Sequence, residues 1–291
     1  MEQKRDLAIV LRAVPYEERH RVVTAITEHH GRISALARNS IQSRRFGGAL
    51  EPFCASEWMF VERRGADLYR VEEAHVKRSF EGLRKDFERL ALASIFNELM
   101  LKLAPEREDC NDLFRLHSNA LATLEEMPGT GADITLLNAY LAKLLQWSGN
   151  HPQLQSCLEC HVPLESYWSS RRAADGSAPK IENVSLSCVV TDAGWVCPNC
   201  RGKQTRHIRD REGQSFNRSL LRVTPAAVTD FFMSLASPIR QVPGLALGTK
   251  EEHQELFKFL EALFIYHVPG FDRVPLKSLR FLGLESSAQH P

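Results

Sequence analysis

The sequence predicts an α+β protein in which a small N-terminal β-barrel is followed by an α-helical domain with a metal-binding module. Three observations predict this fold class: short β-branched runs in the first eighty residues, apolar residues at helical spacing after them, and two C-x-x-C pairs within the helical region. We expect a barrel over residues 1–80, a helical domain over 81–150 and 223–291, and a zinc-binding module over 151–222.

Five short strands account for the expected barrel. Each run is rich in apolar or β-branched residues and is separated from the next by turn-forming residues such as Gly31. The runs cover residues 7–11, 21–26, 33–37, 58–61 and 68–76. An OB-like barrel fits this number of strands, and an SH3-like barrel would give a similar pattern.

After Ser79 the apolar residues follow a helical period instead of the alternation of strands. Three helices are expected over residues 83–103, 112–127 and 133–147. Thr224-Pro225 indicates the start of a fourth helix that continues to residue 235, because proline is favoured in the first turn. Thr249-Lys-Glu-Glu252 has the pattern of a capping box and indicates the start of a fifth helix.

Four cysteines form two pairs, Cys157-Leu-Glu-Cys160 and Cys197-Pro-Asn-Cys200, with 36 residues between them. A C-x-x-C turn directs two thiolates at one point, so two such turns supply the four ligands of a tetrahedral zinc site. A site closed by four cysteines has no open position for a substrate. We therefore expect one structural Zn²⁺ per chain.

Other uses of these cysteines fit less well. A thioredoxin-like pair opens a helix in a βαβ unit, and neither pair has that setting. Seven cysteines are an odd number, and no apolar signal segment follows the first residues, so a disulfide framework is disfavoured. Cys188 and His161 are reserve ligands, whereas Cys54 and Cys110 have apolar neighbours and are expected in the core.

Composition and missing motifs argue against several classes of function. No apolar run approaches the roughly 20 residues that span a bilayer, so we expect a soluble, cytoplasmic protein. Residues 244–250 resemble a phosphate-binding loop, but the glycines are one residue too close and the lysine and threonine are reversed. We find no catalytic motif, so we expect a binding protein that is not an enzyme.

Basic residues are concentrated in two segments although the net charge is only +1. Residues 1–50 carry nine Lys and Arg against five Asp and Glu, and residues 201–222 carry seven against two, which favours contact with a polyanion. A solvated charged surface is the alternative for either segment alone. The candidate DNA contacts are Arg12, Arg21, Arg32, Arg38, Arg44, Arg45, Arg201, Lys203, Arg206 and Arg209. Phe46 and Phe53 could stack on bases, but aromatic side chains of a small barrel usually fill its core.

Several segments resemble the RecO family of recombination-mediator proteins. Leu7-Ala-Ile-Val-Leu-Arg12, Tyr16-Glu-Glu-Arg19 and Gly31-Arg-Ile-Ser-Ala-Leu-Ala-Arg38 are similar to the first strands of that family. Arg44-Arg-Phe-Gly-Gly-Ala-Leu-Glu-Pro-Phe53 is the most specific match. Asp192-Ala-Gly-Trp-Val-Cys197 and Pro275-Leu-Lys-Ser-Leu-Arg-Phe-Leu282 extend the resemblance to about Leu284.

The resemblance implies an OB-fold, a helical domain and a structural zinc module. It also implies a DNA repair protein that binds single- and double-stranded DNA, anneals complementary strands, and helps load RecA onto SSB-coated DNA together with RecR. Motif by motif, it assigns DNA contacts to Arg32, Arg38, Arg44 and Arg45. Asn39 stands where the family commonly has glycine, and Ser40-Ile-Gln-Ser43 is less basic than is usual in the family. Together these departures predict that the loop binds DNA less tightly.

The resemblance further implies that the helical domain binds the acidic C-terminal tail of SSB, for which Lys277 and Arg280 are available cations.

A different class of function also stays open. The chain could be a zinc-containing interaction scaffold whose basic surfaces are incidental and which does not bind DNA directly. Binding of single-stranded DNA at low salt distinguishes the two classes.

Overall fold

The computed structural model describes residues 3–41, 46–62, 65, 67–129, 131, 133–168, 181–182, 184–201, 221–271, 274 and 276–284. The chain divides into two compact units, Met1–Ala132 with Leu276–Leu284, and Asp133–Pro275 with Glu285–Pro291. The domain boundaries at 80, 150 and 222 stay predictions, because compactness alone does not establish which parts fold independently. None of the described helices is both long and apolar enough to span a membrane.

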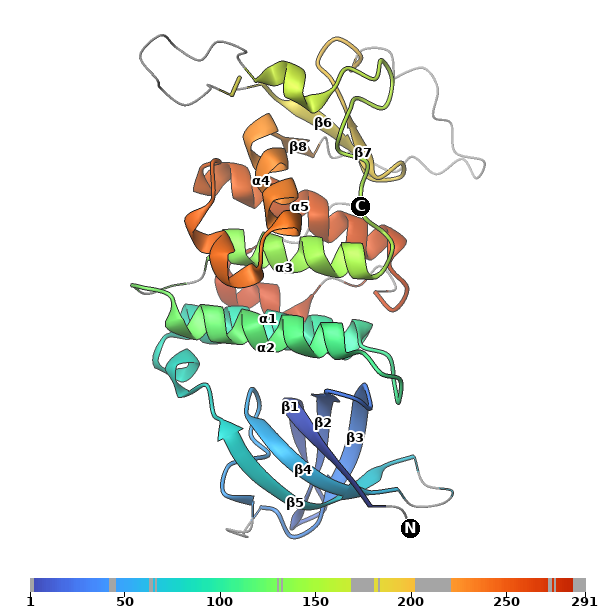
Figure 1. Ribbon diagram of the computed structural model, residues 1–291, viewed down its shortest axis with the longest axis vertical. Helices are drawn as coiled ribbons and strands as arrows, with labels where there is room; N and C mark the ends of the chain where they lie inside the picture. The colour runs from blue at the N-terminus through green and yellow to red at the C-terminus, as the bar shows by residue number, and fades with distance from the viewer. Residues whose placement is uncertain are drawn as a thin grey trace. The chain divides into compact units, whose positions relative to one another are not determined.

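The first unit contains a closed five-stranded barrel (Figure 1). Its strands are β1 (Gln3–Tyr16), β2 (His20–Thr27), β3 (Arg32–Ala37), β4 (Ala55–Val61) and β5 (Tyr69–Arg78). They pair in the order β1-β2-β3-β5-β4, β4 pairs back to β1, and only the β3–β5 contact is parallel. The five predicted strands are thus confirmed, and the arrangement is OB-like.

A β-bulge in β1 decides which side chains face outward. Val10 pairs with Ala25, but Arg12 pairs with Thr24, so Leu11 is an extra residue on β1. Val10 lies in the barrel core before the bulge, whereas Arg12 and Tyr16 are exposed after it. Without the extra residue, the alternation of a strand would turn Arg12 inward.

The helices of the first unit satisfy the backbone at this bulge. Helices α1 (Phe87–Leu103) and α2 (Asn111–Glu126) lie side by side over the barrel (Figure 1). The buried Asn97 side chain of α1 donates to the carbonyl oxygens of Leu11 at 2.9 Å and of Val10 at 3.4 Å. A buried carbonyl left without a partner would cost about 1–3 kcal/mol, so this contact stabilises the bulge.

The barrel core is filled by large side chains with satisfied polar groups. Trp58 and Phe60 are fully buried, and the Trp58 indole N–H donates to Ser56 Oγ at 2.8 Å. The Ser56 hydroxyl donates in turn to the Ala49 carbonyl at 2.9 Å. Phe46 and Phe53 are also buried, which confirms that they belong to the core, so neither of these two rings is open to stack on a base.

The loop between α1 and α2 extends the sheet where β3 and β5 diverge. Within β3, only residues Ala35, Leu36 and Ala37 pair with β5. At the other end of β3, the Arg32 N–H donates to the Pro105 carbonyl at 2.8 Å. Gly31 has a φ of +64°, and a Cβ there would lie 2.2 Å from the Glu108 carbonyl oxygen, so the close approach of this loop requires glycine.

The described part of the first unit also contains the short 3₁₀ helices η2 (Glu81–Lys85) and η6 (Lys277–Leu282). The predicted helix over 83–103 begins later, at Phe87, because Asp86 is extended and its side chain caps the Arg89 N–H at 3.0 Å. η6 lies against α1, where the Glu98 carboxylate accepts hydrogen bonds from the Lys277 and Ser278 N–H groups.

The second unit combines three helices with a small sheet. The helices are α3 (Ile134–Trp147), α4 (Pro225–Ala236) and α5 (Lys250–His267), with the 3₁₀ helices η3 (Leu164–Tyr167) and η5 (Ile239–Gly244). The sheet has the order β7-β6-β8, formed by β6 (Leu186–Val189), β7 (Gly194–Val196) and β8 (Arg222–Val223). Thr224 caps α4 and the predicted capping box of Thr249 and Glu252 begins α5, so both start signals are confirmed.

We expect the first unit to lose stability in mild acid because of His117 on α2. The ring is fully buried, and burial lowers its pKa from 6.5 to about 3. Below pH ~6.5, His117 therefore binds a proton in the unfolded chain but stays neutral in the folded chain. The free energy of unfolding falls by about 1.4 kcal/mol per pH unit down to about pH 3. Urea unfolding at pH 7.5 and 5.0 measures this loss.

A His117→Gln variant removes the titrating group and isolates its contribution from those of other histidines. Its stability is expected to depend less steeply on pH than that of the parent over the same interval. If the stability of the two proteins depended equally on pH, His117 would not be the cause of the acid sensitivity.

Candidate metal centre and nucleic-acid interface

The four predicted metal ligands come together in the second unit. Cys157, Cys160, Cys197 and Cys200 have sulfur atoms within 4.8 Å of one another, although the two pairs lie far apart in sequence. Cys160 is exposed and the other three are buried. Neither Cys188 nor His161 belongs to this group among the described residues.

Backbone hydrogen bonds shape both cysteine turns. In the first pair the His161 N–H donates to the Cys157 carbonyl at 3.0 Å, and in the second the Cys200 and Arg201 N–H groups both donate to the Cys197 carbonyl at 3.1 Å. The Leu158 N–H donates to the Trp195 carbonyl on β7 at 2.9 Å, which ties the first turn to the strand that leads into the second. The fully buried Trp195 anchors this strand through a bond from its indole N–H to the Leu154 carbonyl.

The geometry fits a tetrahedral metal ion. The Cys160 and Cys197 sulfurs are 3.7 Å apart, and Zn–S bonds of ~2.3 Å in a tetrahedron place two sulfurs about 3.8 Å apart. Four thiolates are soft ligands of the kind that select zinc or an iron–sulfur centre over hard cations. The cluster can therefore hold a metal.

Hydrogen bonding and mutual proximity set the protonation of these thiols. Burial raises the pKa of Cys157, but N–H groups of Cys160, Cys197 and Glu159 outweigh it and bring the pKa to about 7. The pKa of Cys200 rises to about 12, because its sulfur interacts with those of Cys197 and Cys160. Metal binding must therefore release protons, so affinity for the metal is expected to decrease as the pH falls.

The predicted DNA contacts of the barrel fall into two groups. Arg21 pairs with Glu51 at 2.7 Å, and Arg32 pairs with Glu106 at 2.9 Å and donates to the Ala104 carbonyl. Arg12 and Arg38 are exposed and form no ion pair with any residue that the structure describes. The free cations of this set are therefore Arg12 on β1 and Arg38 directly after β3.

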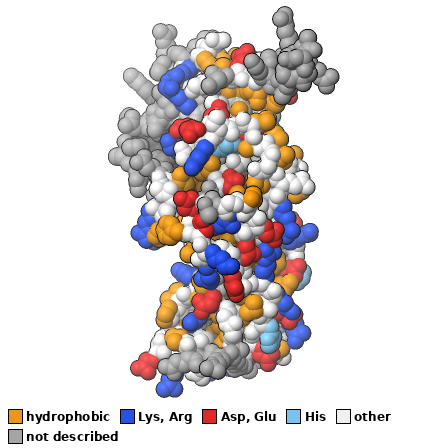
Figure 2. Space-filling view, turned by 90° about the vertical axis from the view of Figure 1, so that its left-hand side faces the viewer, with side chains coloured by type: hydrophobic (Ala, Val, Ile, Leu, Met, Phe, Trp, Pro, Cys, Tyr) orange, Lys and Arg blue, Asp and Glu red, His pale blue; other side chains and the backbone are white. Residues whose placement is uncertain are grey.

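The other predicted contacts are placed as follows. Arg201 is half-buried at the end of the second cysteine turn, while Arg44, Arg45, Lys203, Arg206 and Arg209 lie outside the described residues. Lys277 and Arg280 are exposed on η6. Figure 2 shows that Lys and Arg are interspersed with Asp and Glu on the face drawn, so any attraction for a polyanion there is local.

Sequence reasoning missed Tyr16 and Val14 as surface features of the barrel. Tyr16 is 48% exposed and Val14 is 43% exposed on β1. Strand alternation from the core residue Val10 would have turned both inward, so the bulge at Leu11 hid them from sequence analysis.

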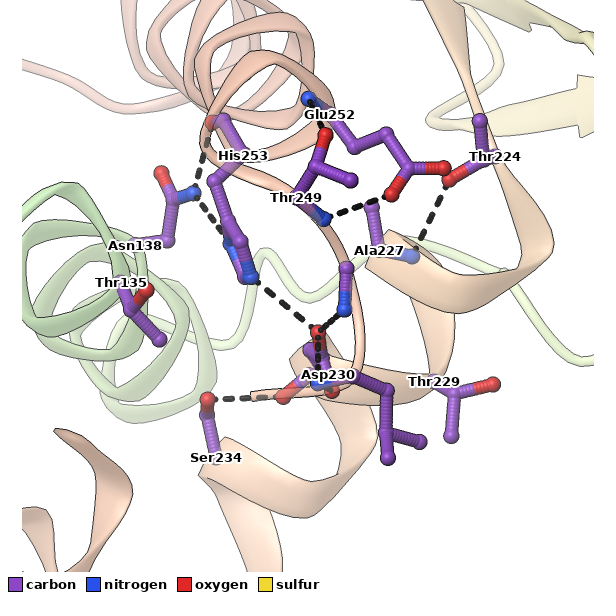
Figure 3. A network of polar contacts seen from close by, with 12 residues as sticks. Thr135, Asn138, Thr224, Ala227, Thr229, Asp230, Ser234, Thr249, Glu252 and His253 are labelled. Atoms are coloured by element: carbon purple, nitrogen blue, oxygen red, sulfur yellow. Dashed lines mark hydrogen bonds and ion pairs between the residues drawn. The ribbon is translucent and has the colours of Figure 1, made fainter. Parts of the chain in front are cut away.

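A buried polar network in the second unit is a further candidate site (Figure 3). The Asp230 carboxylate accepts hydrogen bonds from the Leu247 and Gly248 N–H groups at 2.8–2.9 Å. His253 Nε2 lies 3.1 Å from Asp230 Oδ2, and Asn138 donates to the His253 carbonyl at 2.8 Å. These contacts join α3, α4 and α5. Because Asp230 and His253 are only 3% and 2% exposed, a substrate has no access to the network.

An Asp6, Glu28 and His29 group on the barrel also brings possible metal ligands together. However, the Asp6 carboxylate already accepts bonds from the Leu7 and His29 N–H groups and lies 2.7 Å from His30 Nδ1. These bonds hold the turn between β2 and β3, so we assign the group a structural role.

The structure defines a class of protein that combines an OB-like barrel, which exposes arginines without described ion pairs, with helices and a four-cysteine cluster that could hold a metal. Comparison with known proteins agrees with this class. Residues 1–80 match the family model "Recombination protein O N terminal", and residues 84–220 match "Recombination protein O C terminal". The chain belongs to the RecO family.

Curated relatives carry the name DNA repair protein RecO. The protein from Anaeromyxobacter dehalogenans (strain 2CP-C) is 38% identical over 165 residues, which is 56% of this chain and 64% of the relative. The relative from Geobacter metallireducens is 33% identical over 60% of this chain and 70% of its own length. The relative from Desulfosudis oleivorans is 25% identical over 94% of this chain and 95% of its own length. The chain thus spans under two thirds of the length of the first of these relatives.

We expect Cys157→Ser and Cys197→Ser each to lower bound zinc from about one ion per chain to nearly none, because three thiolates do not close a structural site. Metal analysis of the purified protein measures this, and thermal unfolding should show a loss of stability. Cys188→Ala is the matched control, since Cys188 lies on β6 outside the cluster and should leave the zinc content unchanged. A fully folded parent protein without metal would contradict the expectation.

We expect Asp230→Ala to destabilise the second unit by about 3 kcal/mol, because it leaves the buried His253 and the N–H groups of Leu247 and Gly248 without their partner. Urea unfolding measures the change. Ser234→Ala is the control: its hydroxyl bonds only the Asp230 backbone carbonyl at 2.7 Å, so the loss should stay near 1 kcal/mol. Equal losses in the two variants would mean that the carboxylate has no special role.

Proposed function

We propose that this protein is a DNA repair and recombination mediator that binds single- and double-stranded DNA. It anneals complementary strands and, together with RecR, helps load RecA onto DNA coated with SSB. The observation that carries the proposal is the pair of exposed arginines, Arg12 and Arg38, on the OB-like barrel of a RecO-family chain. Neither has an acidic partner among the described residues, so both are available to phosphate.

Charge neutralisation is the chemical task that annealing requires. Two complementary strands repel one another through their phosphates, and arginine guanidinium groups reduce that repulsion while they hold phosphate in bidentate fashion. The step makes and breaks no covalent bond, so the protein needs no catalytic residue. We therefore propose a binding protein that is not an enzyme.

The four-cysteine cluster would hold one zinc ion as a structural centre. Its four ligands would leave no position for a substrate or for water, so zinc would serve only to hold the two cysteine turns together. This arrangement would fix Arg201 and the start of the basic segment that contains Lys203, Arg206 and Arg209. We propose that segment as a second phosphate-contacting region.

A surface on the first unit supports a protein partner such as the acidic C-terminal tail of SSB. The Phe87 and Phe281 rings are 66% and 45% exposed and meet edge to face at 6.5 Å. The Arg280 guanidinium lies 4.8 Å from the centre of the Phe281 ring, and Lys277 is exposed on the same 3₁₀ helix. Apolar rings beside cations suit a peptide that combines acidic and apolar residues.

That same surface favours the rival function, an interaction scaffold that does not bind DNA directly. The two proposals differ in one measurement. A mediator shifts single-stranded DNA at low salt without a partner, whereas a scaffold binds SSB or RecR but leaves the DNA free.

Replacing Arg12 and Arg38 together by alanine should weaken binding to single-stranded DNA and flatten its dependence on salt. Each phosphate contact contributes about 0.7 to the slope of log affinity against log salt concentration, so two lost contacts lower the slope by about 1.4. Fluorescence anisotropy with a labelled oligonucleotide, titrated at 50 to 200 mM salt, measures both quantities.

Arg240→Ala with Lys250→Ala is the charge-matched control, because both cations are exposed in the second unit. This variant should retain the parent affinity and slope. Unchanged binding in the Arg12 and Arg38 variant would show that these two arginines do not contact the DNA.

A further inference from the structure

The outer surface of β1, β2 and β3 carries an apolar strip beside free cations. Residues in register across these strands form two adjacent rows, Val14–Val22–Leu36 and Arg12–Thr24–Ser34. The intervening rows, such as Ala13–Val23–Ala35, face the barrel core. We call Arg12, Val14, Tyr16, Val22 and Leu36 the outer strand face.

Tyr16 is the aromatic group of the outer strand face. It pairs with His20 at the end of the hairpin, next to the row of Val14 and Val22, and is 48% exposed. The other aromatic residues of the described barrel strands, Trp58, Phe60 and Tyr69, are buried. Tyr16 is therefore the exposed ring of the outer strand face, whereas another exposed ring of these strands, that of His75, lies on β5.

Free cations border this strip. Arg12 lies at one end, exposed Arg19 lies in the turn between β1 and β2, and Arg38 follows β3. No ion pair joins any of the three to a described residue, whereas Arg21 and Arg32 nearby are paired with Glu51 and Glu106. Exposed Glu17 and Glu18 lie beside Arg19 in the turn, so the net positive charge along the strip comes from Arg12 and Arg38. These two cations beside an apolar strip suit a ligand that carries both negative groups and flat apolar rings.

From this arrangement we propose that Tyr16 is a base-stacking residue that makes the outer strand face prefer single-stranded over double-stranded DNA. The proposal rests on the DNA-binding function proposed above and deepens it. Unpaired bases can stack on an aromatic ring while their phosphates meet the arginines. Bases in a duplex are already stacked on one another, so a duplex can use the arginines but not the ring.

Tyr16→Ala tests the proposal, with a fluorescein-labelled 20-residue oligo-dT and a 20-base-pair duplex as probes. Loss of one stacked base corresponds to a decrease in affinity of about 5- to 150-fold for oligo-dT. Affinity for the duplex and the salt slope should stay unchanged, because no phosphate contact is removed. Tyr16→Phe keeps the ring and should bind oligo-dT as the parent does.

Tyr266→Ala is the matched control, since Tyr266 on α5 is 45% exposed in the second unit. It should bind both probes like the parent protein. In a second measurement, an oligonucleotide that carries 5-iodouracil should photo-cross-link to the peptide containing Tyr16 in the unmodified protein, which does not depend on the folding of a variant.

Four results would overturn the proposal: unchanged binding of oligo-dT by Tyr16→Ala, equal losses for both probes, a Tyr16→Phe variant as weak as Tyr16→Ala, or cross-links that avoid this peptide. Failure of the proposed function itself looks different, because the parent protein then binds neither probe. Weaker binding by the Arg12 and Arg38 variant with full binding by Tyr16→Ala would leave the function intact and exclude only the stacking role.

Discussion

The hydrogen bond from Asn97 to the Leu11 carbonyl is the interaction on which the barrel surface depends. It joins a helix to a strand and satisfies the backbone where an extra residue interrupts the pairing of β1 with β2. Because the extra residue reverses the direction of every later side chain, Arg12 and Tyr16 face solvent instead of the core. A single buried amide thus links the helices of the first unit to the surface proposed to bind DNA.

A metal bound to the four-cysteine cluster would stabilise the second unit by means related to those of the buried Asp230 network. In each, a few polar groups hold segments that are distant in sequence: four sulfurs join the two cysteine turns, and one carboxylate joins α4 to the loop before α5. Small sheets such as β7-β6-β8 are too short to be stable alone and need further support. Cross-links by a metal or by a buried carboxylate are a physical source of that support.

Local signals in the sequence predicted the helices, the strands and the cysteine cluster well. Caps such as Thr249 and turns such as Cys197-Pro-Asn-Cys200 act over a few residues, so their structure follows from neighbouring residues alone. The bulge at Leu11 and the ion pairs of Arg21 and Arg32 were not predictable in this way. They depend on Asn97, Glu51 and Glu106, which lie far along the chain from the residues that they contact. No local sequence pattern predicts these contacts.

The loop that follows α1 has a consequence for how the barrel can be separated from the rest of the chain. Residues 105–108 bond to the edge of β3 at Gly31 and Arg32, where β5 no longer reaches. A fragment that stopped at residue 80 would leave these N–H and C=O groups open to solvent, and an open strand edge is a template for pairing with another copy. The helical sequence therefore covers the part of the β3 edge that the barrel strands leave open, and separating the two would risk self-association through that edge.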